Sequence, residues 1–374
     1  MIPNATADTL VKLRLLQSQV HDIEKKSEIL VLQARVMRQM GMFRAAREVL
    51  QAATEATPDH PHVLRSLGLE LFRDGKVAEG LTLYDKGRWQ LPAFEKYRRD
   101  FKAVFWSGEP LHGKRLLLWA EQGIGDQVMQ MRALRKLLRT GADIVLEADP
   151  RLFPLLDGMA EQVELHPQTV PPQPAITRQA FDFQSSLLSA WRFLDTPLSE
   201  GACLTADPAL SARYRSAWAQ MGPARNVGLS WMSRNEATGA ARSVDLSLLR
   251  PLSEKPGIRF HSLQYGAPDL KVESSKLGAP ILSDPGVNPL KRLTEQAAQI
   301  AAMDLVITID NATAHLAGAL GVPVWILLPK GAEWRWGTGV TATPLYPTAR
   351  LFRATDTADW AKALWDLFAA FDAW

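Results

Sequence analysis

The stretch DLVITIDNATAHLAGALGVPVWILLP, residues 304–329, decides the fold class of this chain. It predicts a buried apolar strand at 305–310, a helix at about 311–320 that is rich in small residues, and a second apolar strand at 323–329. Strand–helix alternation of this kind indicates a parallel sheet covered by helices on both faces. The turn that follows the first strand then lies at the carboxyl edge of the sheet, where such folds bind their ligands.

The same alternation extends over most of the chain from about residue 112, in two series separated by the proline-rich segment VPPQPAI at 170–176. Expected strands are 115–120, 143–147 and 163–166 in the first series, and 226–231, 259–264, 305–310 and 323–329 in the second. Helices are expected from Gln127 and Pro150, at about 246–255, 289–303 and 311–320, and once or twice within 356–374. Two such series predict an α/β protein with two doubly wound units that face one another across a cleft.

An internal repeat occupies the first hundred residues. Small residues at helix crossings, a glycine between helices and a final proline recur 34 positions apart: Leu30, Ala34, Gly41, Ala46, Leu50, Ala53 and Pro58 match Leu64, Gly68, Gly75, Gly80, Tyr84, Gly87 and Pro92. This period predicts tetratricopeptide (TPR) helix pairs at about 27–60 and 61–94, and residues 8–26 predict one more amphipathic helix. Repeat surfaces commonly bind a partner, with a structural spacer as the alternative.

The composition indicates a globular protein with a sizeable core. Of the 374 residues, 47% are hydrophobic and 22% are charged, and the net charge of +3 gives no signal for nucleic acid. The single cysteine, Cys203, excludes an internal disulfide framework. The N-terminal sequence lacks the pattern of a signal peptide, and no apolar run is long enough to span a membrane, so we expect a cytoplasmic protein.

The turn after the first expected strand is Glu121-Gln122-Gly123-Ile124-Gly125-Asp126. Its glycines permit a tight turn and close approach of a substrate to the backbone. Asp126 is expected to head a helix, where an N-cap is one role and a base that takes a proton from a substrate hydroxyl is another. Arg132, Lys136 and Arg139 on this helix predict a solvated face.

The second candidate turn follows the strand at 305–310. Asp310 ends that strand, and the helix starting at about Asn311 offers free amides to a diphosphate, with Thr313 and His315 in its first turn. A histidine bonded to a carbonyl in the core is an equal alternative for His315.

Two further loops lie at the carboxyl ends of expected strands. In one of them Trp334 and Trp336 flank Arg335: the two indoles could frame a nucleobase or a sugar and Arg335 could contact a phosphate, although simple packing of the indoles competes. Arg234 and Arg242 follow the strand at 226–231, and one of them could neutralise a leaving diphosphate. The chain has no D-x-D, no H-E-x-x-H, no nucleophile elbow around Ser230 and no G-x-G-x-x-G, which argues against a carboxylate-held metal, a zinc protease, a hydrolase and an NAD enzyme.

These motifs together resemble TPR-containing bacterial glycosyltransferases related to the ADP-heptose heptosyltransferases, glycosyltransferase family nine. The resemblance runs from about residue 27 to 353. It rests on WSGEPLHGKRLLLWAEQGIGDQ (106–127), VGLSW with ARSVDL (227–246), the quoted stretch at 304–329, and EWRWG with LYPTARLFR. It implies a GT-B fold: a TPR module at 1–100, a Rossmann-like acceptor domain at 101–222, a Rossmann-like nucleotide-sugar domain at 223–355 and a helical segment at 356–374.

The resemblance also implies inverting transfer without a metal ion or other cofactor. Asp126 matches the family's general base in an acceptor-side loop that contains Glu121, Gln122, Gly123 and Gly125. Arg242, or Arg234 in its place, matches the residue that stabilises the leaving phosphate. The donor-binding residues by position are Asp310, Asn311, Thr313 and His315, with Trp334 and Arg335 beside them, and the family commonly has threonine at the position of Asn311.

TPR fusions of this kind are similar to transferases that modify proteins, including flagellin. We therefore expect a nucleotide-sugar donor and a protein acceptor presented by the repeats, without distinguishing hexosyl, heptosyl and nonulosonyl transfer. The alternatives are a transferase for lipopolysaccharide or capsule glycan, and a non-catalytic TPR scaffold with a relic donor pocket.

Overall fold

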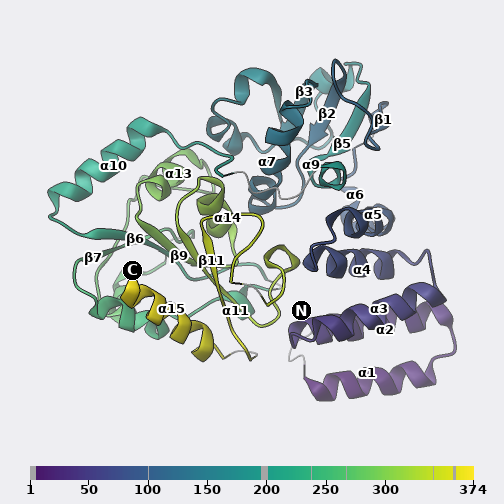
Figure 1. Ribbon diagram of the computed structural model, residues 1–374, viewed down its shortest axis with the longest axis horizontal. Coiled ribbons are helices and arrows are strands. Elements are labelled where there is room, and N and C mark those ends of the chain that lie inside the picture. The colour runs from purple at the N-terminus through teal and green to yellow at the C-terminus, as the bar shows by residue number, and fades with distance from the viewer. Residues whose placement is uncertain are drawn as a thin grey trace.

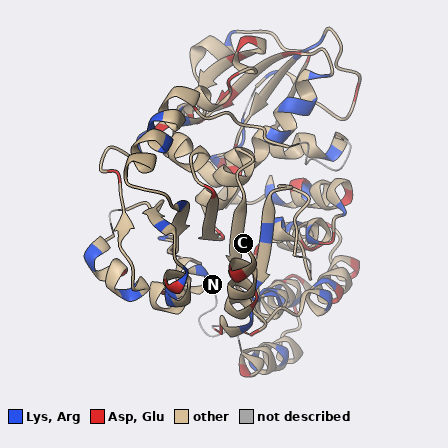
Figure 2. Ribbon diagram, turned by 60° about the vertical axis from the view of Figure 1, so that its left-hand side comes forward, with Lys and Arg blue, Asp and Glu red and all other residues tan. Residues whose placement is uncertain are grey.

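The protein consists of a helical module and two parallel sheets with their covering helices (Figure 1). This computed structural model describes residues 6–99, 101–194, 201–236, 238–266, 268–339, 341–356 and 359–374. Residues 1–5 of the segment considered for a signal peptide lie outside that range. Within the described residues, no helix combines the length and the apolar character needed to cross a membrane. Figure 2 shows basic and acidic residues interspersed over most of the helices.

The helical module stacks antiparallel helices in the order of the chain (Figure 1). Its helices are α1 (Ala7–Gln19), α2 (Ile23–Gln39), α3 (Phe43–Ala56), α4 (Pro61–Arg73), α5 (Val77–Arg88) and the short α6 (Pro92–Glu95). The pairs α2–α3 and α4–α5 turn at Gly41 and Gly75, which have φ of 72° and 82°, a backbone region that glycine adopts readily. The two repeats therefore fold as helix pairs, while their assignment as TPR units stays a prediction.

Glycines allow α4 and α5 to pack backbone against backbone. A Cβ at Gly68 would lie 2.5 Å from the carbonyl oxygen of Gly80, and one at Gly87 would lie 2.4 Å from that of Pro61. This confirms that small residues mark the helix crossings. The helix expected at 8–26 is wrong in its extent: Val20 is extended, and the carboxylate of Asp22 caps α2 by accepting from the N–H of Lys25 at 3.1 Å.

The first sheet is entirely parallel and has the strand order β1-β5-β2-β3-β4. Its strands are β1 (Val104–Phe105), β2 (Arg115–Trp119), β3 (Asp143–Ala148), β4 (Val163–Pro167) and β5 (Phe183–Ser186). The second sheet, also entirely parallel, has the order β11-β10-β9-β6-β7-β8. Its strands are β6 (Arg225–Ser230), β7 (Ile258–Ser262), β8 (Ile281–Leu282), β9 (Leu305–Ile309), β10 (Val324–Leu328) and β11 (Ala349–Arg353).

Helices connect and cover the strands of both sheets. The α-helices are α7 (Ile124–Leu138), α8 (Pro174–Thr177), α9 (Leu187–Ala190), α10 (Pro208–Gln220), α11 (Gly239–Arg242), α12 (Leu270–Leu277), α13 (Thr294–Ala301), α14 (Ala312–Ala319) and α15 (Ala361–Ala373). The 3₁₀ helices are η1 (Pro150–Leu155), η2 (Ala160–Gln162), η3 (Trp191–Phe193), η4 (Leu246–Glu254) and η5 (Trp334–Trp336). The expected helix at 289–303 is shorter than predicted, and the described residues of the last segment contain one helix, α15.

The helices expected from Pro150 and at 246–255 are 3₁₀ helices rather than α-helices. Pro154 lies inside η1 and Pro251 lies inside η4. Because proline has no N–H and its ring clashes with the preceding turn, a regular α-helix does not continue through either residue. All seven predicted strands are present, and β1, β5, β8 and β11 were not predicted.

Candidate functional site

The two candidate turns meet at the junction of the sheets. The turn after β2 leads into α7, and the turn after β9 leads into α14, so both lie at carboxyl ends of parallel strands. A Cβ placed on Gly125 would lie 3.2 Å from Cα of Ala312 and 3.3 Å from Cδ2 of His315. The absence of a side chain at Gly125 therefore lets the first turns of α7 and α14 touch.

Asp126 is the third residue of α7 and not its N-cap, which corrects the N-cap interpretation, although its carboxylate takes part in a capping box. The helix begins at Ile124 with Gly123 as its N-cap, and the N–H of Gly123 donates to Oδ2 of Asp126 at 3.3 Å. The other carboxylate oxygen, Oδ1, accepts a hydrogen bond from Nη2 of Arg335. Asp126 thus joins the first turn to the opposite unit through an ion pair.

The start of α14 is capped by its own sequence, which corrects the expectation of free amides. Oδ1 of Asn311 accepts from the N–H groups of Thr313 at 2.9 Å and Ala314 at 3.4 Å. The amide of Asn311 donates to Oγ of Ser230 at 2.9 Å, and that hydroxyl also contacts Oγ1 of Thr313 at 3.4 Å. A diphosphate could reach those two amides only after Asn311 turned away, because an N-cap oxygen satisfies the same donors.

His315 lies in the core of this junction. Its Nδ1 is 2.8 Å from the hydroxyl of Tyr346, and its ring stacks on Trp336 with centroids 5.0 Å apart and an interplanar angle of 20°. Burial, reinforced by the positive charges of Arg335, Arg242 and Arg132, lowers the pKa of His315 well below its usual value. The imidazole is therefore neutral at physiological pH, and a hydroxyl rather than a backbone carbonyl is its partner.

Arg242, at the end of α11, lies beside the turn after β9. Its Nη1 donates to the carbonyl oxygen of Asp310 at 3.1 Å and lies 3.4 Å from Oδ2 of the same residue. Burial raises the pKa of Asp310, and Arg242 opposes that rise. Arg234 is exposed and donates to the carbonyl oxygen of Gly266 instead. The structure therefore brings Arg242, and not Arg234, to the α14 turn.

The loop after β10 carries two predicted site residues, Trp334 and Arg335, which contact different parts of the protein. Trp334 packs edge-on against Phe72 of α4, with ring centroids 4.2 Å apart, so it faces the helical module. The guanidinium of Arg335 lies 4.7 Å from the ring centroid of Trp334 and forms an ion pair with Asp126. Although burial acts to lower it, the carboxylates of Asp126, Glu333 and Asp310 raise the pKa of Arg335 above its usual value.

The acceptor-side loop is bound to the helical module. Glu121 is fully buried and forms an ion pair with Arg88 of α5, which is also fully buried. Arg88 further donates to Asp85 at 2.8 Å, to Ser189 at 3.0 Å and to Ser186 at 3.3 Å. Sequence reasoning missed Arg88, because an arginine near the end of an amphipathic helix carries no signal that it is buried.

The helical module also contacts the second sheet unit. Nη1 of Arg73 donates to the carbonyl oxygen of Ala332 at 2.6 Å, and a Cβ on Gly331 would lie 2.8 Å from the carbonyl oxygen of Arg38. The module is therefore packed against both units, beside the place where their turns meet.

Arg132 of α7 corrects the expectation of a solvated face. Only 2% of this residue is exposed, and its guanidinium lies 4.6 Å from the ring centroid of Tyr346. It donates to the carbonyl oxygen of Gly201 at 3.2 Å and to that of Gly318, in α14, at 3.5 Å. Arg132 thus links the two units, whereas Arg139 is exposed.

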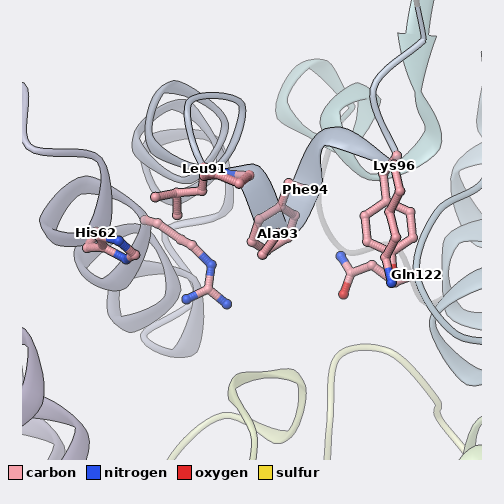
Figure 3. Close-up of a pocket in the computed structure, with 9 residues that line it drawn as sticks. His62, Leu91, Ala93, Phe94, Lys96 and Gln122 are labelled. Atoms are coloured by element: carbon pink, nitrogen blue, oxygen red, sulfur yellow. The ribbon is translucent and has the colours of Figure 1, made fainter.

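A pocket of about 430 Å³ lies where the helical module meets the turn before α7 (Figure 3). Gln122 contributes the wall from the turn, and residues of α4 and of the segment around α6 contribute the rest. Gln122 has a φ of 69°, the only positive value among the described non-glycine residues. Its side-chain amide lies 3.4 Å from the hydroxyl of Tyr84.

Known proteins similar to this chain include one curated relative and several solved structures. No protein-family model matches the chain. Protein FlbA of Caulobacter vibrioides is 32% identical over 351 residues, which cover 87% of this chain and 58% of FlbA. The chain therefore spans less than two thirds of the length of that relative.

Two of the similar structures are bacterial glycosyltransferases. ADP-heptose LPS heptosyltransferase II of E. coli matches with a TM-score of 0.50 and 14% identity, over 69% of this chain and 99% of that one. A glycosyl transferase of family 9 from Veillonella parvula matches with a TM-score of 0.48 and 13% identity, over 66% of this chain and 88% of that one. The heptosyltransferase II match confirms the predicted resemblance at the level of the fold: this chain has two parallel-sheet units arranged as in that enzyme.

Proposed function

We propose that this chain is a glycosyltransferase that moves a sugar from a nucleotide-sugar donor to a hydroxyl of a protein acceptor. The observation that carries this proposal is the meeting of the EQGIGD turn with the first turn of α14, which puts Asp126 and Arg242 on facing units. The fold shared with heptosyltransferase II supports a nucleotide sugar as the donor. The helical module packed against Glu121 supports a polypeptide as the acceptor, with flagellin the first one to test, and a cytoplasmic location belongs to the same proposal.

In the proposed reaction, Asp126 takes the proton of the acceptor hydroxyl as its oxygen attacks the anomeric carbon. Both carboxylate oxygens already accept one hydrogen bond, and each keeps a further lone pair for the hydroxyl. Arg335 orients the carboxylate from the opposite unit. Arg242 supports the negative charge that develops on the leaving phosphate, a role that does not require a metal ion.

The proposed donor site requires a local rearrangement at α14. Asn311 holds the amides that a diphosphate would use, so the donor must displace its side chain or bind through Arg242, Asp310 and the outer edge of the turn. Neutral His315 then provides a polar wall rather than a positive charge. Inverting stereochemistry and transfer without a cofactor are part of this proposal.

A non-catalytic scaffold is the second candidate, and the same capping of α14 favours it. Titration calorimetry against ADP-, UDP-, GDP-, CMP- and dTDP-sugars separates the two candidates. Binding of one nucleotide sugar, weakened by Arg242→Gln and unchanged by Arg250→Gln on the exposed side of η4, supports the transferase. Failure of every nucleotide sugar to bind supports the scaffold.

The acceptor class needs a separate experiment. Intact-protein mass spectrometry of flagellin from a strain lacking this protein should show the loss of a glycan mass that returns on complementation. Loss from lipopolysaccharide or capsule with unchanged flagellin would favour the glycan alternative. Deletion of residues 1–100 does not test this point, because Leu81 and Tyr84 of the module belong to the same hydrophobic core as α7.

A further inference from the structure

The pocket between the helical module and the turn before α7 is lined by both cationic and aromatic side chains. Figure 3 shows His62 and Gln122 on opposite sides of the pocket, with Phe94 between them. Gln122 directly precedes Gly123, whose N–H holds the carboxylate of Asp126. The pocket therefore adjoins the turn that carries the proposed base.

Two cations of the pocket wall lack a carboxylate partner among the described residues. The guanidinium of Arg65 lies 5.1 Å from the ring centroid of Phe94, and its buried Nε has no hydrogen-bond partner. The ammonium of Lys96 lies 4.9 Å from the ring centroid of Tyr97. Arg38, Arg73 and Arg88 of the same module, by contrast, are each paired with a carboxylate.

The remaining charges near the pocket leave this positive potential in place. Burial, and then His60 and Arg65, lower the pKa of His62, so its ring is neutral at pH 7. Burial also lowers the pKa of Arg65, while Tyr84, which hydrogen-bonds its side chain, and then Glu333 act against this. An anionic group that entered the pocket would meet a guanidinium already held in position by aromatic rings.

The shape and the position of the pocket favour a polypeptide side chain. Leu91, Ala93 and Phe94 give it an apolar wall that suits methylene groups and backbone. Gln122 holds its amide at the opposite wall with a positive φ, and strain of this kind at a non-glycine residue is concentrated at ligand sites.

We infer that this pocket binds an Asp or Glu side chain of the protein acceptor, with its carboxylate on Arg65 and with Lys96 adding to the positive potential of the wall. The substrate class is then an acidic polypeptide segment whose hydroxyl residue lies close to the bound carboxylate. This inference rests on the proposed function for its biological meaning, but the binding of an acidic peptide is measurable without any donor.

The test uses the full chain and two fluorescein-labelled peptides, repeating Glu-Ala-Ser and repeating Gln-Ala-Ser, followed by fluorescence anisotropy. We expect binding of the Glu peptide only, weakened about tenfold or more by Arg65→Gln, since a charge-assisted hydrogen bond contributes at least that much. Lys96→Gln, at an exposed position, should weaken binding without a risk to folding, and Arg65→Lys should retain part of it. Arg14→Gln on exposed α1 makes the same change in net charge and should leave the affinity unchanged.

Equal binding of the two peptides, or equal effects of Arg65→Gln, Lys96→Gln and Arg14→Gln, would overturn the inference. Displacement of the Glu peptide by CMP-N-acetylneuraminate, whose sugar carries a carboxylate, would reassign the pocket to the donor and overturn it as well. Failure of the proposed function looks different: no nucleotide sugar binds, while the Glu peptide still binds in an Arg65-dependent way.

Discussion

The ion pair between Arg88 and Glu121 gives the strongest prediction about stability, because both side chains are fully buried. Replacing Arg88 with Met leaves the Glu121 carboxylate in the core without its counter-charge. Removal of one partner from a buried pair costs about 3–5 kcal/mol. Ser186 and Ser189 lose a donor too, but they keep a hydrogen bond to each other at 2.8 Å and add little. Asp85, which is also buried, loses its ion pair with Arg88 and adds to the cost in both the single and the double variant.

The double variant Arg88→Met/Glu121→Gln removes both charges, so we expect it to recover about 2 kcal/mol or more of the sum of the single losses. Urea unfolding, followed by tryptophan fluorescence and by circular dichroism, measures these free energies of unfolding. Lys86 on the same helix pairs with Asp59 at 2.7 Å, both exposed, and Lys86→Met should cost less than about 1 kcal/mol. An Arg88→Met variant as stable as Lys86→Met, or losses that add, would refute the reasoning.

Two other perturbations test the packing and the titration of single residues. Gly68→Ala should lower the free energy of unfolding by about 1–3 kcal/mol, because the new Cβ would lie 2.5 Å from the carbonyl oxygen of Gly80. Gly286→Ala is the control: its Cβ would meet only a side chain, with an oxygen at 3.1 Å, so it should cost less in the same urea experiment. Burial, aided by Arg259, lowers the pKa of His261 from 6.5 to about 4. Between these two pH values the unfolded chain binds more protons than the folded chain does. The free energy of unfolding should therefore fall by up to about 3 kcal/mol as the pH drops through that range. His261→Gln should flatten this part of the pH profile of the free energy of unfolding; a profile that this variant leaves unchanged would contradict the assignment.

The strands that gave the clearest signal in the sequence are apolar runs buried on both faces. β2, β9 and β10 are of this kind, with nearly every residue buried. β5 gave no such signal because its sequence is FQSS, although Gln184 is buried and its amide donates to the carbonyl oxygens of Phe101 and Ala103. A polar strand stabilised by specific hydrogen bonds leaves no trace in hydrophobic periodicity.

The candidate site, too, could be predicted from the sequence only in part. The turns containing Asp126 and Asn311 could be placed at strand ends because glycine and small residues follow apolar strands. Arg335 could also be placed at a strand end, but its ion pair with Asp126 could not be predicted. Arg88 and Arg132 come from helices in which they look like surface arginines, so their burial could not be predicted. Burial of a charge depends on tertiary partners that local patterns do not encode.

Asp126 itself offers the most direct test of the central claim, that this junction transfers a sugar. Once a donor and an acceptor are identified, Asp126→Asn should lower the rate of transfer by roughly 10²–10⁴-fold, the usual contribution of a general base, while donor affinity stays unchanged. Asp157→Asn, at an exposed position in the same unit, serves as the control, and urea unfolding checks that the loss of the Arg335 ion pair has not unfolded the variant. Transfer by folded Asp126→Asn at the wild-type rate would contradict the account.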